Sequence, residues 1–114
     1  MPWNLDSDKP IFIQIVERIE SDIVSGKYAP GEKLPTVRDL AVEAAVNPNT
    51  MQKAYGELER IGLVFSQRTS GRFVTEDKTL IEKTRKDLAK NAASEFLARM
   101  KELGIGKEDA IKLL

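Results

Sequence analysis

The sequence predicts a mostly α-helical protein with one β-hairpin, organised as an N-terminal domain over residues 1–76 and a short two-helix tail over residues 77–114. Three observations predict this class. Apolar residues recur every three or four positions in several segments. Two short β-branched and aromatic runs, LVFSQ and RFVT, flank the turn residues RTSG. The chain of 114 residues, 41% hydrophobic, is long enough for one modest core.

The expected helices have recognisable starts and stops. Thr36 followed three residues later by Asp39 resembles a capping box, and Asn47 followed by Pro48 is a good N-cap with a good first helical residue. Residues 1–9 precede the first helix as an irregular segment, in which Trp3 is expected to pack on a neighbouring helix. The expected helices cover residues 10–25, 36–45, 47–61, 78–103 and 107–114.

A helix, a short helix, a tight turn, a third helix and a hairpin together form the winged helix-turn-helix arrangement. Such a domain places its third helix in a DNA major groove, so the outer face of that helix must be polar and free of acids. The face opposite the apolar stripe of residues 47–61 meets this demand, because residues 44–56 contain no Asp or Glu. Its polar residues are Asn49, Thr50, Gln52 and Lys53.

The net charge neither predicts nor excludes nucleic acid, because 18 basic residues balance 18 acidic ones. A DNA-binding function must therefore rest on where the cations lie. They are expected in the loop before the second helix, in the second and third helices, and in the hairpin. The candidates are Lys33, Arg38, Lys53, Arg68 and Arg72.

The absence of cysteine and histidine from the sequence excludes disulfides, thiolate nucleophiles, histidine bases and the usual zinc ligand sets. We therefore expect no enzyme, no metal and no cofactor. Nothing resembles a signal peptide, and no apolar run approaches the ~18 residues that span a membrane, so a cytoplasmic protein is expected. A protein-docking module is the second hypothesis, which an apolar or acidic outer face on the third helix would favour.

The collinear motif GKYAPGEKLPTVRDLA…VNPNTMQKAYGELERIGLVFSQRTSGRFV closely resembles the N-terminal DNA-binding domain of the GntR family of bacterial regulators. The opening LDSDKPIFIQIVERIE and the short tail are similar to its small YtrA-like subfamily. The resemblance implies a sequence-specific transcriptional regulator, acting as a repressor.

The resemblance also implies roles for individual residues. Arg38 is expected to grip backbone phosphate, and Gly71 is expected at the tip of a wing that enters the minor groove. Some larger relatives carry arginines where this chain has Pro48 and Gln52, so their base contacts are not carried over. The predicted DNA-binding residues are Lys33, Thr36, Arg38, Asn47, Asn49, Thr50, Gln52, Lys53, Arg68, Gly71 and Arg72.

The long helix of the tail is expected to pair two copies of the chain. Its apolar residues form a stripe too extended for one small domain to cover, and a two-fold partner is the simplest way to bury it. Such a homodimer would read a palindromic operator in double-stranded DNA. The sequence leaves open whether a small-molecule effector binds beside the tail or concentration alone controls binding. The predicted interface residues are Ile81, Leu88, Ala92, Phe96, Met100 and Leu103.

Overall fold

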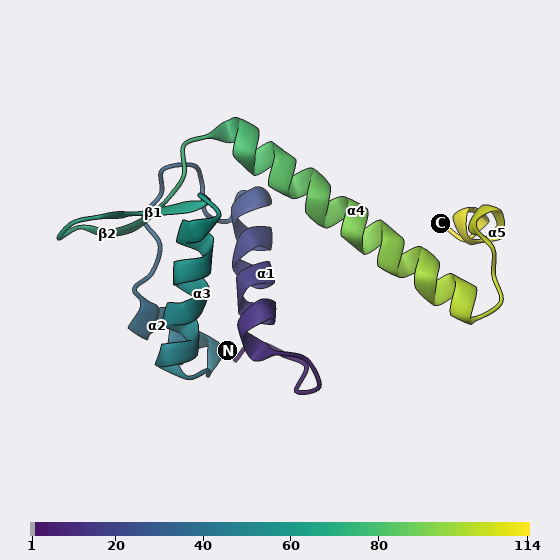
Figure 1. Cartoon of the computed structure of the whole chain (residues 1–114), viewed down its shortest axis with the longest axis horizontal. Helices are drawn as coiled ribbons and strands as arrows, with labels where there is room; N and C mark the ends of the chain where they lie inside the picture. The colour runs from purple at the N-terminus through teal and green to yellow at the C-terminus, as the bar shows by residue number, and fades with distance from the viewer. Residues whose placement is uncertain (1) are drawn as a thin grey trace.

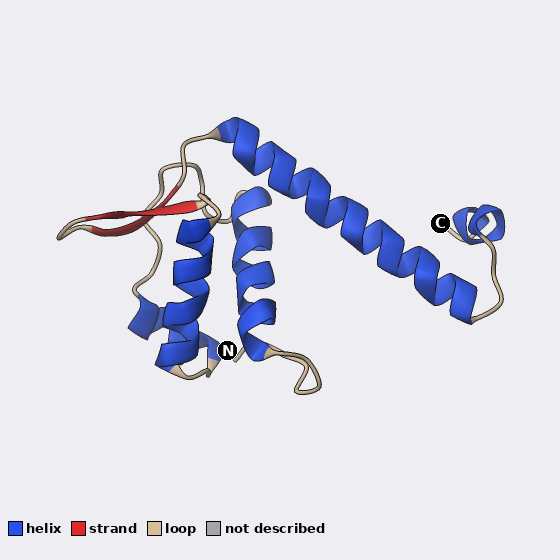
Figure 2. Cartoon of the chain, in the orientation of Figure 1, coloured by secondary structure: helices blue, strands red, loops and turns tan. Residues whose placement is uncertain are grey.

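The computed structural model describes residues 2–114, which form five helices and one hairpin (Figure 1, Figure 2). Every predicted element is present, so the predicted fold class is confirmed. No helix in this part of the chain is long and apolar enough to cross a membrane. The elements are α1 (Ile11–Val24), α2 (Val37–Ala44), α3 (Pro48–Arg60), β1 (Val64–Gln67), β2 (Gly71–Val74), α4 (Lys78–Glu102) and α5 (Lys107–Lys112).

The core lies between α1 and α3, which run side by side (Figure 1). Each of the two helices buries one face, because its apolar residues recur at three- and four-residue spacing. Burying a large aliphatic side chain stabilises the fold by about 1.5–3 kcal/mol. The buried residues at this contact include Ile15, Ile19 and Ile23 of α1 and Met51, Ala54 and Leu58 of α3.

Two helix caps fix the starts of α2 and α3. The Thr36 hydroxyl accepts a hydrogen bond from the Asp39 N–H at 3.1 Å, and the Asn47 side-chain oxygen accepts one from the Asn49 N–H at 2.7 Å. Between them, Ala45 takes the left-handed conformation, with φ 60°, and ends α2. The chain therefore passes from α2 to α3 through only three residues, as in a helix-turn-helix.

The segment before α1 is anchored at this turn. The backbone N–H of Trp3 donates to the carbonyl of Ala44 at 3.3 Å, and the indole ring is 9% exposed. The Arg18 guanidinium of α1 lies 4.6 Å from the centre of the ring. The prediction that Trp3 packs on a neighbouring helix is confirmed.

The hairpin has two different faces. Its strands are antiparallel, with Val64 opposite Val74 and Phe65 opposite Phe73. Because side chains alternate along a strand, the valines are buried against the core while the two phenylalanines stack on the outer face, their ring centres 5.8 Å apart. The hairpin is thus attached at its base and projects from the domain (Figure 2).

The tail begins on the domain and then leaves it. Helix α4 crosses the end of α1 and projects away (Figure 1), so the molecule reaches 54 Å along its longest axis. Ile81, in the first turn, is only 6% exposed and belongs to the same core as α1 and α3. The prediction that Ile81 faces a second copy is therefore wrong, because the start of α4 is covered by its own domain. At the far end, Ala110 of α5 is completely buried.

Candidate nucleic-acid interface

The exposed face of α3 is polar. Asn49 and Gln52 are exposed, and Gly56 follows them one turn later, while Met51 and Leu58 on the opposite face are fully buried. Because residues four apart lie on one side of a helix, the exposed positions form one strip along α3. The strip contains no acidic side chain.

Thr36 and Asn47 cap α2 and α3, as the sequence predicts, and their contact with phosphate stays a prediction. Thr36 and Asn47 use their side-chain oxygens in the caps and remain exposed. Arg38 follows Thr36 in the first turn of α2; it is also exposed and forms no ion pair within residues 2–114. Thr50 is half-buried, beside the start of α3.

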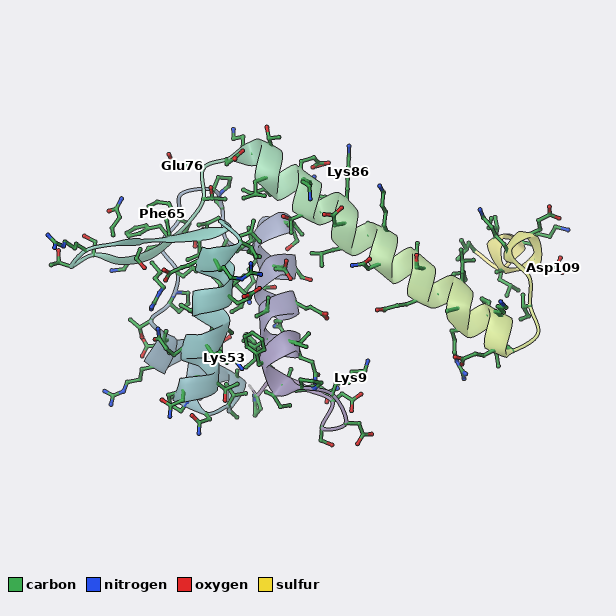
Figure 3. The ribbon with its side chains drawn as sticks, in the orientation of Figure 1. Lys9, Lys53, Phe65, Glu76, Lys86 and Asp109 are labelled. Carbon is green, nitrogen blue, oxygen red and sulfur yellow. The ribbon has the colours of Figure 1, made fainter. Side chains whose placement is uncertain are left out.

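Lys53 lies farther from the centre of this strip than the sequence indicated. Its ammonium is 4.5 Å from the centre of the Phe12 ring on α1 (Figure 3). Because this cation–π contact holds the side chain at the boundary between α3 and α1, Lys53 marks the edge of the candidate interface. A side chain as long as lysine can still reach outward from that position.

Tyr55 connects α3 to the loop before α2. The ring is 1% exposed, and the hydroxyl donates to the carbonyl of Pro35 at 2.7 Å. Burial raises the pKa of the Tyr55 hydroxyl well above its ordinary value, so the group stays a neutral donor. Tyr55 is therefore a core residue whose hydroxyl ties α3 to the loop before α2.

The hairpin brings a glycine and a lysine together. Gly71 has φ +111°, and a Cβ atom placed there would lie 3.0 Å from Cε of Lys33. This region of φ strongly favours glycine, and a Cβ atom there would require the flexible end of the Lys33 side chain to shift. Arg68, in the turn of the hairpin, is exposed and has no ion-pair partner in the described chain. Arg68 therefore lies in the turn of the hairpin, and the side chain of Lys33, from the loop before α2, lies beside Gly71.

Arg72 is not a free cation. Its Nε lies 2.5 Å from Oε1 of Glu59, and the guanidinium carbon lies 5.4 Å from the centre of the Tyr55 ring. The hydroxyl of Ser66 donates to the same Glu59 oxygen at 2.9 Å. The hydrogen bond from Arg72 lowers the pKa of Glu59, with a smaller contribution from Ser66, so this carboxylate stays ionised.

Sequence reasoning gave Glu59 no role, because it considered only the acid-free stretch of residues 44–56. The Glu59 side chain faces the hairpin. The only sequence signal for this ion pair was an acid near the end of α3 and an arginine on β2. Whether two such residues meet depends on the tertiary fold. The charge of Arg72 is consequently balanced inside the molecule.

The distal tail exposes apolar surface. Ala92 and Leu103 are exposed, Leu103 at 55%, while Leu88, Phe96 and Met100 are half-buried. Leu88 packs against the core of the domain and the other four lie beyond it. The apolar residues at the chain end, which the sequence analysis did not assign to this surface, add to it. They are Ile111, Leu113 and Leu114, exposed at 52%, 67% and 88%.

Comparison with known proteins identifies the family. Residues 13–74 match the family described as "Bacterial regulatory proteins, gntR family". The HTH-type transcriptional regulator YhcF of Bacillus subtilis is 39% identical over 112 residues, which cover 98% of this chain and 93% of YhcF. The HTH-type transcriptional repressor YtrA of the same organism is 42% identical over 78 residues, 67% of this chain and 60% of YtrA.

Solved structures agree. A GntR family transcriptional regulator from Listeria monocytogenes superposes with a TM-score of 0.86 at 44% identity and covers 96% of both chains. The DNA-binding domain of AraR, solved in complex with operator ORE1, has a TM-score of 0.57 at 35% identity, covering 66% of this chain and 94% of the domain. The expectation of a regulator rather than an enzyme is confirmed. This chain belongs to the GntR family of bacterial regulatory proteins and is a DNA-binding transcriptional regulator with a winged helix.

Proposed function

We propose that this regulator is a repressor that binds a palindromic operator as a homodimer, with α3 in the major groove and the hairpin at the minor groove. One observation carries the proposal: α3 exposes an acid-free polar strip while its other face is completely buried, and Arg38 in the first turn of α2 is exposed as well. A helix that presents donors and acceptors in this way suits base edges in a major groove. The operator complex of the similar AraR domain supports DNA as the partner.

The dimer part of the proposal rests on the tail. Beyond Leu88, α4 and α5 expose Leu103, Ile111 and Leu113, which the rest of the described chain leaves uncovered. Apolar area removed from water contributes about 25 cal/mol per Å². A second copy would cover this surface with its own, and the two-fold axis would repeat the reading helix on the DNA.

A salt titration tests DNA binding. Four cations per subunit remain for phosphate once Arg72 is paired with Glu59: Lys33, Arg38, Lys53 and Arg68. A dimer that neutralises about four to eight phosphates should show log K falling against log salt with a slope of about −4 to −7. Duplexes are first selected from a random pool. The binding constant of each is then measured at salt concentrations from about 50 to about 300 mM, where release of counterions from DNA governs the affinity. No selected duplex, or a flat salt response, would contradict the proposal.

A protein-docking role is the competing class. It would need an apolar or acidic outer face on α3, and the exposed Asn49 and Gln52 provide neither. Capture of protein partners with no enrichment of DNA in the same selection would favour that class over ours.

A further inference from the structure

Arg85 of α4 reaches back to the end of α1. Its Nε and one terminal nitrogen both donate to the carbonyl oxygen of Val24, at 3.1 and 2.9 Å. Val24 is the last residue of α1, 61 positions earlier in the sequence. A second terminal nitrogen of Arg85 pairs with Glu82 on the same helix at 2.6 Å.

The chemistry of a helix end explains this contact. The last carbonyl groups of a helix have no partner within the helix and carry the negative end of its dipole, so they favour a cation. Helix α1 has no basic residue in its last turn. Arg85 therefore supplies from α4 the cation that α1 lacks, and because the guanidinium is planar with both donors in one fork, the contact constrains direction as well as distance.

Polar side-chain contacts between the tail and the domain are few in the part of the chain that the structure describes. Within residues 2–114, the two bonds from Arg85 are the only side-chain hydrogen bonds or ion pairs that join α4 or α5 to α1, α2, α3 or the hairpin. The remaining contacts are apolar and come from Leu80, Ile81 and Leu88. Hydrophobic contact holds surfaces together but is non-directional. The direction of α4 thus depends more on Arg85 than on these apolar residues. Lys86, the next residue along α4, points away from α1 (Figure 3).

A small change of direction at Arg85 is large at the end of α4. The helix continues for 17 residues from Arg85 to Glu102, which is about 26 Å at 1.5 Å per residue. A tilt of about 8° moves that end by about 3.6 Å, close to the ~3.4 Å rise of one base pair.

We propose that Arg85 is a positioning residue, which fixes the direction of α4 against the DNA-reading domain and thereby sets the separation of the operator half-sites. The proposal rests on the proposed function, since the distal tail must join the two copies. Loss of the Val24 contact then leaves each reading helix intact but lets the two domains take a range of separations.

The first experiment needs no DNA. The sequence contains no cysteine, so Glu43→Cys on α2 and Lys101→Cys on α4 accept two spin labels without background. Labelled protein is mixed with excess unlabelled wild type, so that only distances within one chain are measured. We expect a narrow distance distribution, and in Arg85→Ala a distribution at least about twofold wider.

Arg99→Ala is the matched control, because Arg99 has the same i,i+3 pairing on α4, with Glu102, but lies far from α1. It should keep the wild-type width. If Arg85→Ala does not fold, Arg85→Lys is tested in its place, because lysine keeps the charge but lacks the planar guanidinium. The distance distribution of Arg85→Lys should be wider than that of the wild type. A wild-type width in every folded Arg85 variant would overturn the proposal.

The second experiment measures operator spacing. Duplexes carrying the selected half-site in two copies are varied one base pair at a time, and full-length protein is titrated against each. When the spacing changes by one base pair, the operator affinity of the wild type and of Arg99→Ala should fall about tenfold or more. The affinity of Arg85→Ala should fall less than about threefold. Sharp spacing in Arg85→Ala would overturn the inference. Failure of the wild type to bind any duplex would overturn the proposed function instead and leave the distance result standing.

Discussion

Glu59 at the end of α3 holds Arg72 of β2 through an Nε–Oε1 contact of 2.5 Å, and Ser66 of β1 joins the same oxygen. One carboxylate thus ties both strands of the hairpin to the helix whose outer strip is the candidate reading face. This ion pair therefore opposes a shift of the hairpin relative to α3.

The ion pair predicts a pH dependence. A carboxylate whose pKa is lowered in the folded state stabilises the fold above its ordinary pKa, about 4.3, and this contribution is lost as pH falls through the lowered value. Glu59→Gln should therefore destabilise the protein most near neutral pH and progressively less below about pH 4. Urea unfolding between pH 7 and pH 2.5 measures the difference. Glu57→Gln is the control: Arg60 lowers the pKa of Glu57 in the same direction, but Arg60 is 70% exposed and Arg72 only 26%, so the same pH dependence should be smaller. A pH dependence of equal size in both variants would contradict the assignment.

The reading face predicts two different binding defects. Arg38→Ala should weaken specific and nonspecific DNA alike, because we assign this side chain to the backbone. Gln52→Ala should instead relax discrimination at one base position per half-site, at a cost of about 1–3 kcal/mol. Titration of each folded variant against the selected operator and its single-base variants separates the two. Sequence preference unchanged in Gln52→Ala would move the reading face elsewhere.

Gly71 predicts a wing defect. A valine at φ +111° is strained, and its Cβ would lie 3.0 Å from the Lys33 side chain. Gly71→Val should lower operator affinity, whereas Ser70→Val, in the same turn, lacks the conformational demand and should bind nearly as the wild type does. If both bind equally well, Gly71 is an ordinary turn residue and the wing does not enter a groove.

The tail predicts a monomeric variant. Phe96→Glu places a charge on the distal half of α4 and should give folded monomers with much-reduced operator affinity. Because Phe96 is half-buried within its own chain, Leu103→Glu is a second variant at a residue that is already 55% exposed. Sizing chromatography gives the oligomeric state and circular dichroism the fold. Dimers that persist in both variants would place the interface elsewhere.

The features that local chemistry determines could be predicted from the sequence. The caps at Thr36 and Asn47 depend on residues two or three positions away, so their pattern predicts both helices and the turn between them. The contacts of Arg72 and Arg85 join residues 13 and 61 positions apart, and no local pattern indicates which acid or carbonyl each arginine meets. Ile81 shows the same limit, since the apolar spacing of α4 does not reveal where its own domain stops covering it.

Trp3 is the only tryptophan of the chain, and it is fixed by Ala44 and Arg18 at the turn that leads into α3. It lines a surface hollow together with Asn47 and Thr50, both among the proposed DNA contacts. Indole emission depends on the polarity and mobility of its surroundings. If DNA contacts Asn47 and Thr50 as proposed, we expect the Trp3 emission to change on binding, so that fluorescence would follow the interaction in the unmodified protein, without a dye.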